Sequence, residues 1–454
     1  MSRNEFGSKF GLIMATIGSA VGLGNIWRFP AETQENGGAA YLLLYMACVF
    51  ILGLPVMLAE FSLGRGGRSD SIGVFKKLSP KTNWWLVGLI SIVAAYFISC
   101  FYMVVNGWTI EYLLHSVTGS LYAPIEGIAE SGNALFTAKM NQYVNSDWMP
   151  LIFTWIAIIV NIFILLGGVQ KGIERLSNTM MPLLFVALLA LCIVSLTLPG
   201  AGEGVKWFLT PDFSLITIDT VVSALGHAFF SLSLGIGALI TYASYFPSDA
   251  RMASTSVYVG LATLLVALLS GLVIFPAASS FGLEGGEALR GTTLVFQTLP
   301  EVFAQLPLTQ LWSTVFFFLL LVAAMTSIVS IMEVPVAFLC DRFGMSRKLS
   351  VILTHLPLFV LSGLCSLSFG SLNHIDILGF SIFDFFDYVS ANILLPVGGI
   401  GICIYLGWFA PKGLLKSQLT NEGTIKSRVA GLVQFILRYV APVIITLIMV
   451  AKFI

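Results

Sequence analysis

The stretch that decides the fold is Gly18-Ser19-Ala20-Val21-Gly22-Leu23-Gly24-Asn25-Ile26-Trp27-Arg28-Phe29-Pro30, inside the first long apolar segment of the chain. The residues from Phe10 to Ile17 are apolar enough to cross half of a bilayer as a helix. The glycines that follow make the backbone permissive, and Asn25 and Arg28 place polar groups at membrane depth. Because unpaired backbone groups are costly in hydrocarbon, such an interruption survives only where it lines a cavity or binds a ligand. The sequence therefore predicts a membrane helix broken at a binding site.

The groups that this break exposes suit ligands of both charges. Carbonyl oxygens freed by the break can hold a hard cation such as sodium. Free N–H groups at the start of the second half-helix suit a carboxylate. One break can therefore bind an ion and an acid together.

A second interruption lies near the middle of the chain, at Phe229-Phe230-Ser231-Leu232-Ser233-Leu234-Gly235-Ile236-Gly237. A single such cluster has a simpler interpretation, because small residues also let two membrane helices approach closely. Two interrupted segments, one opening each half of the chain, together with Arg28 at depth, favour an inverted-repeat secondary transporter with its site at the bilayer midplane.

The composition indicates a polytopic membrane protein. Of 454 residues, 57% are apolar and 10% are charged, which leaves too few charges to cover a soluble globule. The formal net charge is zero, so nothing favours nucleic acid as a partner. The six cysteines are scattered over apolar segments, which argues against a disulfide framework and a zinc site. With no nucleophile motif, phosphate loop or metal-ligand cluster, the sequence predicts neither an enzyme nor an organic cofactor.

Apolar runs of roughly 20 helical residues or more predict an all-α protein with eleven transmembrane helices. They lie near residues 10–33, 40–63, 84–114, 149–167, 174–198, 218–246, 254–280, 310–340, 349–370, 381–409 and 429–453. Lys and Arg gather in alternate connections, and the opposite connections hold Lys139, Lys206 and Arg290. Because basic loops stay in the cytoplasm, we expect the N-terminus to be cytoplasmic and the C-terminus to be external. We expect the protein to lie in the inner cell membrane.

The first break, followed by Glu35-Asn36-Gly37-Gly38-Ala39, resembles the first-helix signature of the neurotransmitter:sodium symporter family. Further similar motifs are Ser231-Leu232-Ser233-Leu234-Gly235, Thr241-Tyr242-Ala243-Ser244-Tyr245, Lys171-Gly172-Ile173-Glu174 and Thr326-Ser327. The resemblance, to a bacterial member, runs from about residue 5 to about residue 450. Family members commonly have twelve spans, so this chain departs from the family at its periphery.

The resemblance implies the leucine-transporter fold over a single transporter domain, residues 1–454. This fold is a 5+5 inverted repeat with discontinuous helices 1 and 6. Repeat one would cover about 10–198, repeat two about 218–409, and an extra helix about 429–453. Gly172 tolerates unwinding and Pro182 removes a helix hydrogen bond, so we expect this segment to open a cytoplasmic water path, as a similar family motif also suggests. An ordinary helix start is the alternative.

The resemblance also implies two sodium sites made of oxygen ligands, which suit a small hard cation. The second site would use the carbonyls of Gly18, Val21 and Ala323 and the hydroxyls of Thr326 and Ser327. Taken alone, these two hydroxyls have the simpler interpretation of hydrogen bonds back to their own helix.

The first sodium site would use Ala20, Asn25, Ser231 and Thr263. Related members carry Asn or an acid where this chain has Thr263. Where this chain has Ala267, chloride-dependent members carry Ser and some chloride-independent members carry Glu, so neither form of negative-charge compensation is visible. His227, near the family's chloride position, could supply a titratable proton instead. An ordinary hydrogen-bonded core histidine is the alternative.

The substrate site that the resemblance implies has a polar and an apolar end. A carboxylate would meet the N–H groups of Leu23 and Gly24, the Tyr102 hydroxyl and the first sodium, and Gly22 leaves room where aminergic members have Asp. The remaining contacts would be Ser19, Ala20, Ile98, Phe230, Ser231, Ser233, Ile236, Ser327 and Ile331. Because this set has no charged group, burying an ionised side chain there would be costly. The expected cargo is a neutral, mostly hydrophobic amino acid.

Ionisable residues at depth are candidates for gates. Arg28 and Asp387 match the family's extracellular pair, with Asp384 as the competing partner. Arg3 and Asp341 match the cytoplasmic pair, and Phe6 sits where many members have Trp.

These observations predict a sodium-coupled symporter that imports a neutral, mostly hydrophobic L-amino acid by alternating access, with two sodium ions and the lipid bilayer as its partners. The alternatives are a proton-coupled or single-sodium carrier, suggested by Thr263 and His227, and a channel or a transport-inactive sensor of the same fold.

Overall fold

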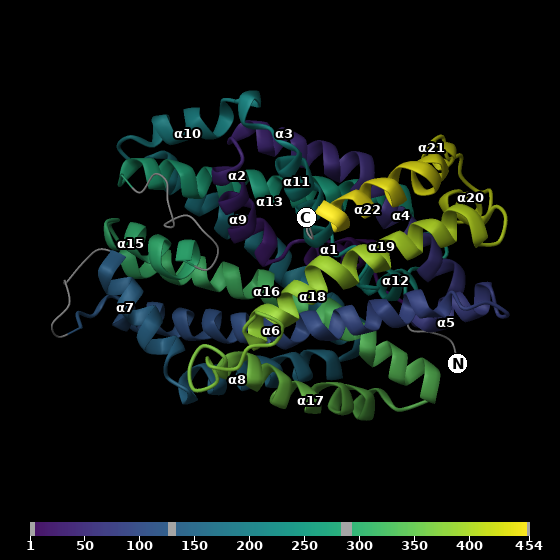
Figure 1. The fold of residues 1–454 in the computed structure, drawn as a ribbon, viewed down its shortest axis with the longest axis horizontal. Helices are drawn as coiled ribbons and strands as arrows, with labels where there is room; N and C mark the ends of the chain where they lie inside the picture. Colours follow the sequence, from purple (N-terminus) through teal and green to yellow (C-terminus); the bar gives the residue numbers. More distant parts are fainter. Residues whose placement is uncertain (1–4, 126–132, 283–292, 452–454) are drawn as a thin grey trace.

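The computed structural model describes residues 5–125, 133–282 and 293–451, and it consists of helices that lie side by side in one bundle (Figure 1). Within these ranges the backbone forms no β-strand, only two isolated bridges, Gly38 with Pro211 and Ile377 with Phe380. The predicted all-α polytopic architecture is confirmed.

The helices of the first half, with η marking π-helical or 3-10 segments, are α1 (Lys9–Ala20), η1 (Gly24–Arg28), α2 (Phe29–Glu35), α3 (Ala39–Cys48), η2 (Val49–Gly53), α4 (Leu54–Gly67), α5 (Ser71–Leu78), α6 (Trp85–Thr118), η3 (Ser120–Tyr122), α7 (Asn133–Val144), α8 (Trp148–Leu166), η4 (Val169–Glu174) and α9 (Arg175–Leu196). Those of the second half are α10 (Ala201–Leu209), η5 (Phe213–Leu215), α11 (Ile218–Ser231), α12 (Ala238–Ala243), α13 (Met252–Ser280), η7 (Leu294–Thr298), α15 (Leu299–Ala304), α16 (Thr309–Phe343), α17 (Arg347–Leu367), α18 (Ile382–Val389), η8 (Ser390–Leu394), α19 (Leu395–Ile404), η9 (Tyr405–Phe409), α20 (Leu414–Leu419), α21 (Ala430–Phe435), η10 (Ile436–Val440) and α22 (Ala441–Ala451).

The spans lie where the apolar runs predict them. In the described part of the chain, nine continuous helices are long and apolar enough to cross a membrane. A tenth span is the pair Lys9–Ala20 and Gly24–Glu35, which bends by 54°. The other predicted span is also interrupted, because α11 ends at Ser231 and α12 begins at Ala238.

The interior is built around α6 and α16. Of the most apolar stretch of α16, 83% is buried inside the protein, compared with 33% for the Ala430–Ala451 span. Figure 1 shows α6 and α16 running through the middle of the bundle, while α17 and α22 lie on its outside. The exposed apolar side chains of the outer helices suit contact with lipid, whereas α1 and α16 position buried groups.

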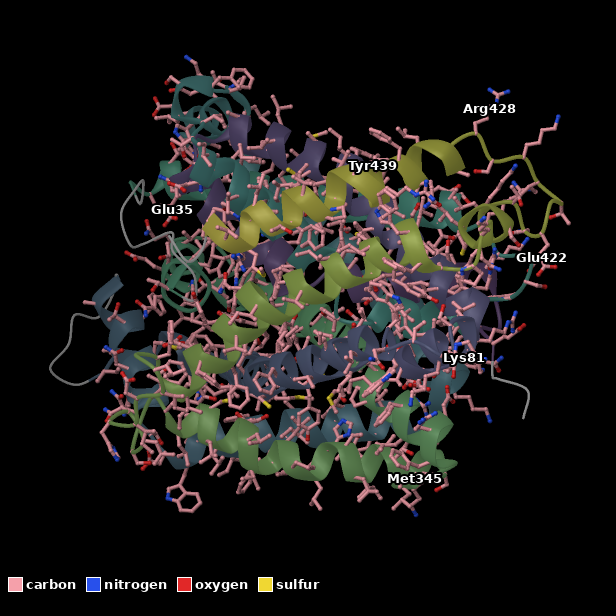
Figure 2. The ribbon with its side chains drawn as sticks, turned by 45° about the vertical axis from the view of Figure 1, so that its right-hand side comes forward. Glu35, Lys81, Met345, Glu422, Arg428 and Tyr439 are labelled. Carbon is pink, nitrogen blue, oxygen red and sulfur yellow. The ribbon has the colours of Figure 1, made fainter. Side chains whose placement is uncertain are left out.

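The two ends of the bundle differ in their residues. Figure 2 shows Lys81, Met345, Glu422 and Arg428 at one end and Glu35 at the other. We call the end with Lys81 and Arg428 the basic end. It also holds α5, α20 and the start of α17 (Figure 1).

Close contact between α4 and α12 depends on a glycine. A Cβ atom added at Gly64 would lie 2.1 Å from the Ile240 carbonyl oxygen and 2.8 Å from the Ala243 Cβ. At Gly431, by contrast, an added Cβ would have no atom within 4 Å.

We predict that Gly64→Ala lowers the unfolding free energy by about 1–3 kcal/mol, because overpacking forces the helices apart. The midpoint of thermal unfolding in detergent measures this change, and Gly431→Ala is the matched control, for which no loss is expected. Equal midpoints for the two variants would contradict the close contact.

Candidate functional site

The first break is where the sequence predicts it. The helix α1 ends at Ala20, and Val21 is extended with φ −89° and ψ 101° before η1 begins at Gly24. The N–H groups of residues 21–23 donate instead to the Ile17 carbonyl, the Asn25 Oδ1 and the Tyr102 Oη.

The second break depends on backbone conformations that favour glycine. Gly235 and Gly237 have φ of 82° and 81°, and Ser233 has φ of 55°. A Cβ at Gly235 would lie 2.5 Å from the Leu395 carbonyl oxygen, so no larger residue fits there. The freed backbone is satisfied in part by Glu60 of α4, whose Oε1 accepts a hydrogen bond of 2.7 Å from the Gly235 N–H.

The two breaks contact each other directly. The Ser233 Oγ donates a 2.7 Å hydrogen bond to the Ser19 carbonyl oxygen at the end of α1. The Ser19 Oγ donates in turn to the Ser330 Oγ of α16 at 2.8 Å. Two irregular segments more than 200 residues apart are thus joined to each other and to the central helix.

A small cavity with a water-accessible volume of about 20 Å³ lies at this junction. It is lined by all the residues predicted to contact the substrate, together with Asn25: Ser19, Ala20, Gly22, Leu23, Gly24, Ile98, Tyr102, Phe230, Ser231, Ser233, Ile236, Ser327 and Ile331. Among these described lining residues there is no Asp, Glu, Lys, Arg or His. An ionised ligand side chain would have no counter-charge here.

One end of the cavity is polar. The Leu23 N–H donates a 3.3 Å hydrogen bond to the Tyr102 Oη. A Cβ at Gly22 would lie 3.1 Å from the Tyr102 Oη and 3.2 Å from the Ser327 Oγ. The Leu23 N–H and the hydroxyls of Tyr102 and Ser327 are donors suited to a carboxylate. The rest of the wall is apolar and includes Ile98, Ile236 and Ile331.

The residues predicted for the first sodium site gather around Tyr45, which the sequence reasoning missed. The Tyr45 Oη lies 2.8 Å from the Ser231 Oγ and 3.5 Å from the Asn25 Nδ2. The Asn25 Nδ2 also donates to the Thr263 carbonyl oxygen at 3.4 Å. The Thr263 Oγ1 is buried and has no hydrogen-bond partner among the described residues. The structure brings Asn25, Ser231 and Thr263 together, with Ala20 in the adjoining cavity wall.

The residues predicted for the second sodium site also meet, where α1 crosses α16. A Cβ at Gly18 would lie 3.1 Å from the Thr326 Cβ. The Thr326 Oγ1 donates back to the Val322 and Ala323 carbonyl oxygens at 2.9 and 3.2 Å, which is the simpler interpretation of this hydroxyl. The role of Gly18, Val21, Ala323, Thr326 and Ser327 in sodium binding stays a prediction.

The expected ion pair between Arg28 and Asp387 is not formed in this structure. Among the described residues, the carboxylate within 4.0 Å of the Arg28 guanidinium is that of Glu32, at 3.3 Å. Glu32 stands one helical turn along the same helix, a spacing that favours a local pair. Arg28 also lies 5.6 Å from the centre of the Phe230 ring. The competing Asp384 is held at the start of α18, where its carboxylate accepts from Ser381.

The remaining titratable candidates are the cytoplasmic pair and His227. Arg3 lies outside the described residues, and the Asp341 Oδ2 accepts from the Asp70 N–H at 2.8 Å. His227 lies between the Phe29 and Tyr45 rings, and neither of its ring nitrogens has a hydrogen-bond partner among the described residues. The described contacts therefore do not support the interpretation of His227 as an ordinary hydrogen-bonded core histidine.

Two carboxylates at the basic end were not assigned a role from sequence. The Glu174 Oε1 accepts from the Ser8 Oγ at 2.8 Å, and its Oε2 accepts from the Gly7 N–H at 2.7 Å. Glu174 belongs to the Lys171–Glu174 motif, which could have drawn attention to it. The fully buried Glu333 pairs with Arg347 at 2.7 Å and accepts from the Tyr245 Oη at 2.8 Å.

Known proteins resemble this chain over almost its whole length. An uncharacterized sodium-dependent transporter, YhdH of Bacillus subtilis, is 35% identical over 98% of this chain and 96% of its own. The sodium-dependent dopamine transporter of Bos taurus is 27% identical over 90% of this chain and 63% of its own. The crystal structure of MhsT in complex with L-phenylalanine superposes with a TM-score of 0.88 at 39% identity, covering 99% of this chain and 100% of that one.

The profile of the Sodium:neurotransmitter symporter family matches residues 3–125 and 135–454, which together include both breaks and every residue of the cavity. The chain is therefore a multi-pass membrane transporter rather than an enzyme, and it belongs to the Sodium:neurotransmitter symporter family.

Proposed function

We propose that this transporter imports a neutral, mostly hydrophobic L-amino acid together with sodium by alternating access. The observation that carries the proposal is the uncharged cavity at the junction of the two breaks, which has N–H and hydroxyl donors at one end and isoleucines at the other. The complex of the similar MhsT with L-phenylalanine supports the same class of cargo.

Two sodium ions would supply enough free energy for accumulation. At an inside-negative potential near 100 mV, each ion contributes about 2.3 kcal/mol, and a tenfold gradient adds about 1.4 kcal/mol. Two ions would then support roughly a 10⁵-fold concentration ratio of substrate. We assign one ion to the group around Tyr45 and one to the contact of α1 with α16.

The proposed orientation places the basic end in the cytoplasm, because Lys and Arg favour that side. The N-terminus is then cytoplasmic and the C-terminus external. We assign residues 10–198 and 218–409 to the two inverted repeats and residues 429–453 to the extra helix. Arg28 and Asp387 would close the external side in another state of the cycle, with Arg3 and Asp341 on the cytoplasmic side.

Release of sodium to the cytoplasm would begin at η4. This π-helical turn contains Gly172, and Pro182 lies inside the following helix α9, so the segment is poorly held by regular hydrogen bonds. Its last residue, Glu174, holds Gly7 and Ser8 just before α1. Unwinding of η4 would therefore release α1 in the same step as it opens a water path.

Uptake into proteoliposomes tests the proposed function. With radiolabelled neutral amino acids, we expect accumulation that requires an inward sodium gradient and stops when potassium or choline replaces sodium. Uptake that persists without sodium at acidic pH would replace this proposal with a proton-coupled carrier, for which His227 and Thr263 are the candidates. Binding without uptake would indicate a sensor, and substrate-gated current far above carrier rates would indicate a channel.

We predict that Gly22→Asp abolishes amino-acid binding, because the carboxylate would take the place of the substrate acid beside Tyr102 and Ser327. Gly22→Ala adds the Cβ without the charge, and we expect at least a tenfold loss of affinity from crowding. Equilibrium binding of labelled substrate measures both. Unaltered affinity in Gly22→Asp would show that the substrate carboxylate binds elsewhere.

We predict that Glu174→Gln loosens the start of α1, because an amide replaces charge-assisted hydrogen bonds to Gly7 and Ser8. Hydrogen–deuterium exchange of residues 5–11 in sodium should accelerate about tenfold, as expected for the loss of such a bond. Glu203→Gln, an exposed position on α10, is the control. Exchange that matches the control would rule out this link.

A further inference from the structure

A second, larger cavity opens at the basic end, outside the substrate site. Its water-accessible volume is about 580 Å³. Its walls come from four parts of the chain: the first residue of α1, the end of α4, the connection between α12 and α13, and the segment from α20 to Ile425. Figure 2 shows Glu422, one of its residues, at the tip of this end.

The side chains of this cavity carry an excess of positive charge. Lys9, Arg65, Arg68 and Arg251 line it, against two acids, Asp249 and Glu422. The pair of Lys9 with Asp249 is long, at 3.6 Å, and the two side chains are 80% and 70% exposed. Arg251 has no ion-pair partner within 4.0 Å among the residues that the structure describes. At least one cation is therefore available to a ligand.

Arg65 and Arg68 give this cavity a fixed wall. The Arg65 guanidinium donates to the Ala250 carbonyl at 2.7 Å and to the Gln418 Oε1 at 2.8 Å, so it joins α4 to the neighbouring connections. Arg68 donates to the Phe246 carbonyl at 3.2 Å and pairs with Glu5. A pre-formed frame of this kind lowers the ordering cost of binding.

The wall of the cavity is followed in sequence by the last apolar span. Ile425 lies on its wall, Lys426 and Arg428 follow in sequence, and α21 begins at Ala430. On α21, Leu432 and Phe435 are 61% and 54% exposed, which suits contact with acyl chains. Basic pockets beside a membrane helix on the cytoplasmic side suit the phosphate groups of anionic lipids.

We propose that this cavity binds a phosphate-bearing anion, with Lys9 and Arg251 supplying the positive charge. The phosphate belongs either to the headgroup of an anionic phospholipid or to a soluble phosphate, since both present the same acceptor oxygens. The bound anion bridges Lys9 of α1 and Arg251 of the α12–α13 connection. On the proposed function, in which the basic end opens to the cytoplasm, an anion that bridges these two segments favours the state in which that end is closed.

Lipid retention tests the proposal without any need for transport. Purified protein is titrated with phosphatidylglycerol or phosphatidylcholine, and the adducts are counted by native mass spectrometry. We expect the wild type to bind phosphatidylglycerol in preference to phosphatidylcholine. Each cation removed should lower the affinity about fivefold, once in Arg251→Gln and a second time in Lys9→Gln/Arg251→Gln. Arg251→Lys should restore binding, and Lys348→Gln, an exposed cation at the same end but outside the cavity, should leave it unchanged.

Thermal unfolding in phosphatidylcholine nanodiscs supplies the second arm. If inorganic phosphate raises the unfolding midpoint of the wild type but not of Arg251→Gln, at matched ionic strength, the site takes soluble phosphate. If only phosphatidylglycerol distinguishes the two proteins, the source is the lipid headgroup. If neither ligand distinguishes wild type from Lys9→Gln/Arg251→Gln, or if Lys348→Gln loses as much binding, the proposal is wrong. Each readout is independent of the amino-acid cargo.

Discussion

The hydrogen bond from Ser233 to the Ser19 carbonyl joins the two irregular segments on which the rest of the molecule depends. Neither break could exist in hydrocarbon alone, because its backbone groups would lack partners. The Ser233 hydroxyl of the second break gives the Ser19 carbonyl of the first a hydrogen-bond partner, and the buried Glu60 accepts from the Gly235 N–H. Residues of both breaks also line the cavity in which we propose that the substrate binds.

The same arrangement connects the cavity to the ends of the bundle. Just before α1, Gly7 and Ser8 donate hydrogen bonds to Glu174. Two residues after the end of α12, the Tyr245 hydroxyl donates to Glu333. Phe6 lies between them, against the rings of Tyr242 and Tyr245. In the proposed mechanism, a ligand bound at the breaks and the hydrogen bonds of Glu174 and Glu333 would act on the same two segments. This is the physical basis for alternating access in the proposed mechanism.

Much of the cavity could be predicted because its residues follow from local patterns: glycines and hydroxyls at the breaks, and a resemblance that placed Ile98, Tyr102 and Ile331. Glu60 and Tyr45 were missed because a lone polar residue in an apolar run gives no periodic signal about its partner. The pairing of Arg28 with Glu32 rather than Asp387 shows another limit, because the residue types alone do not say which of several carboxylates a guanidinium contacts. The hydrogen bond from Thr326 to the Val322 carbonyl follows from its place inside a helix, where the carbonyls of the preceding turn are within reach.

The measurement that tests the central claim most directly is equilibrium binding of labelled L-phenylalanine to purified protein, with sodium titrated against potassium. If the joined breaks hold ion and carboxylate together, binding requires sodium, and two ions give a Hill slope above one. Hyperbolic dependence would reduce the account to one ion. Binding that is equal in potassium and in sodium would contradict it, because the carboxylate would then bind without the cation that the breaks are expected to hold.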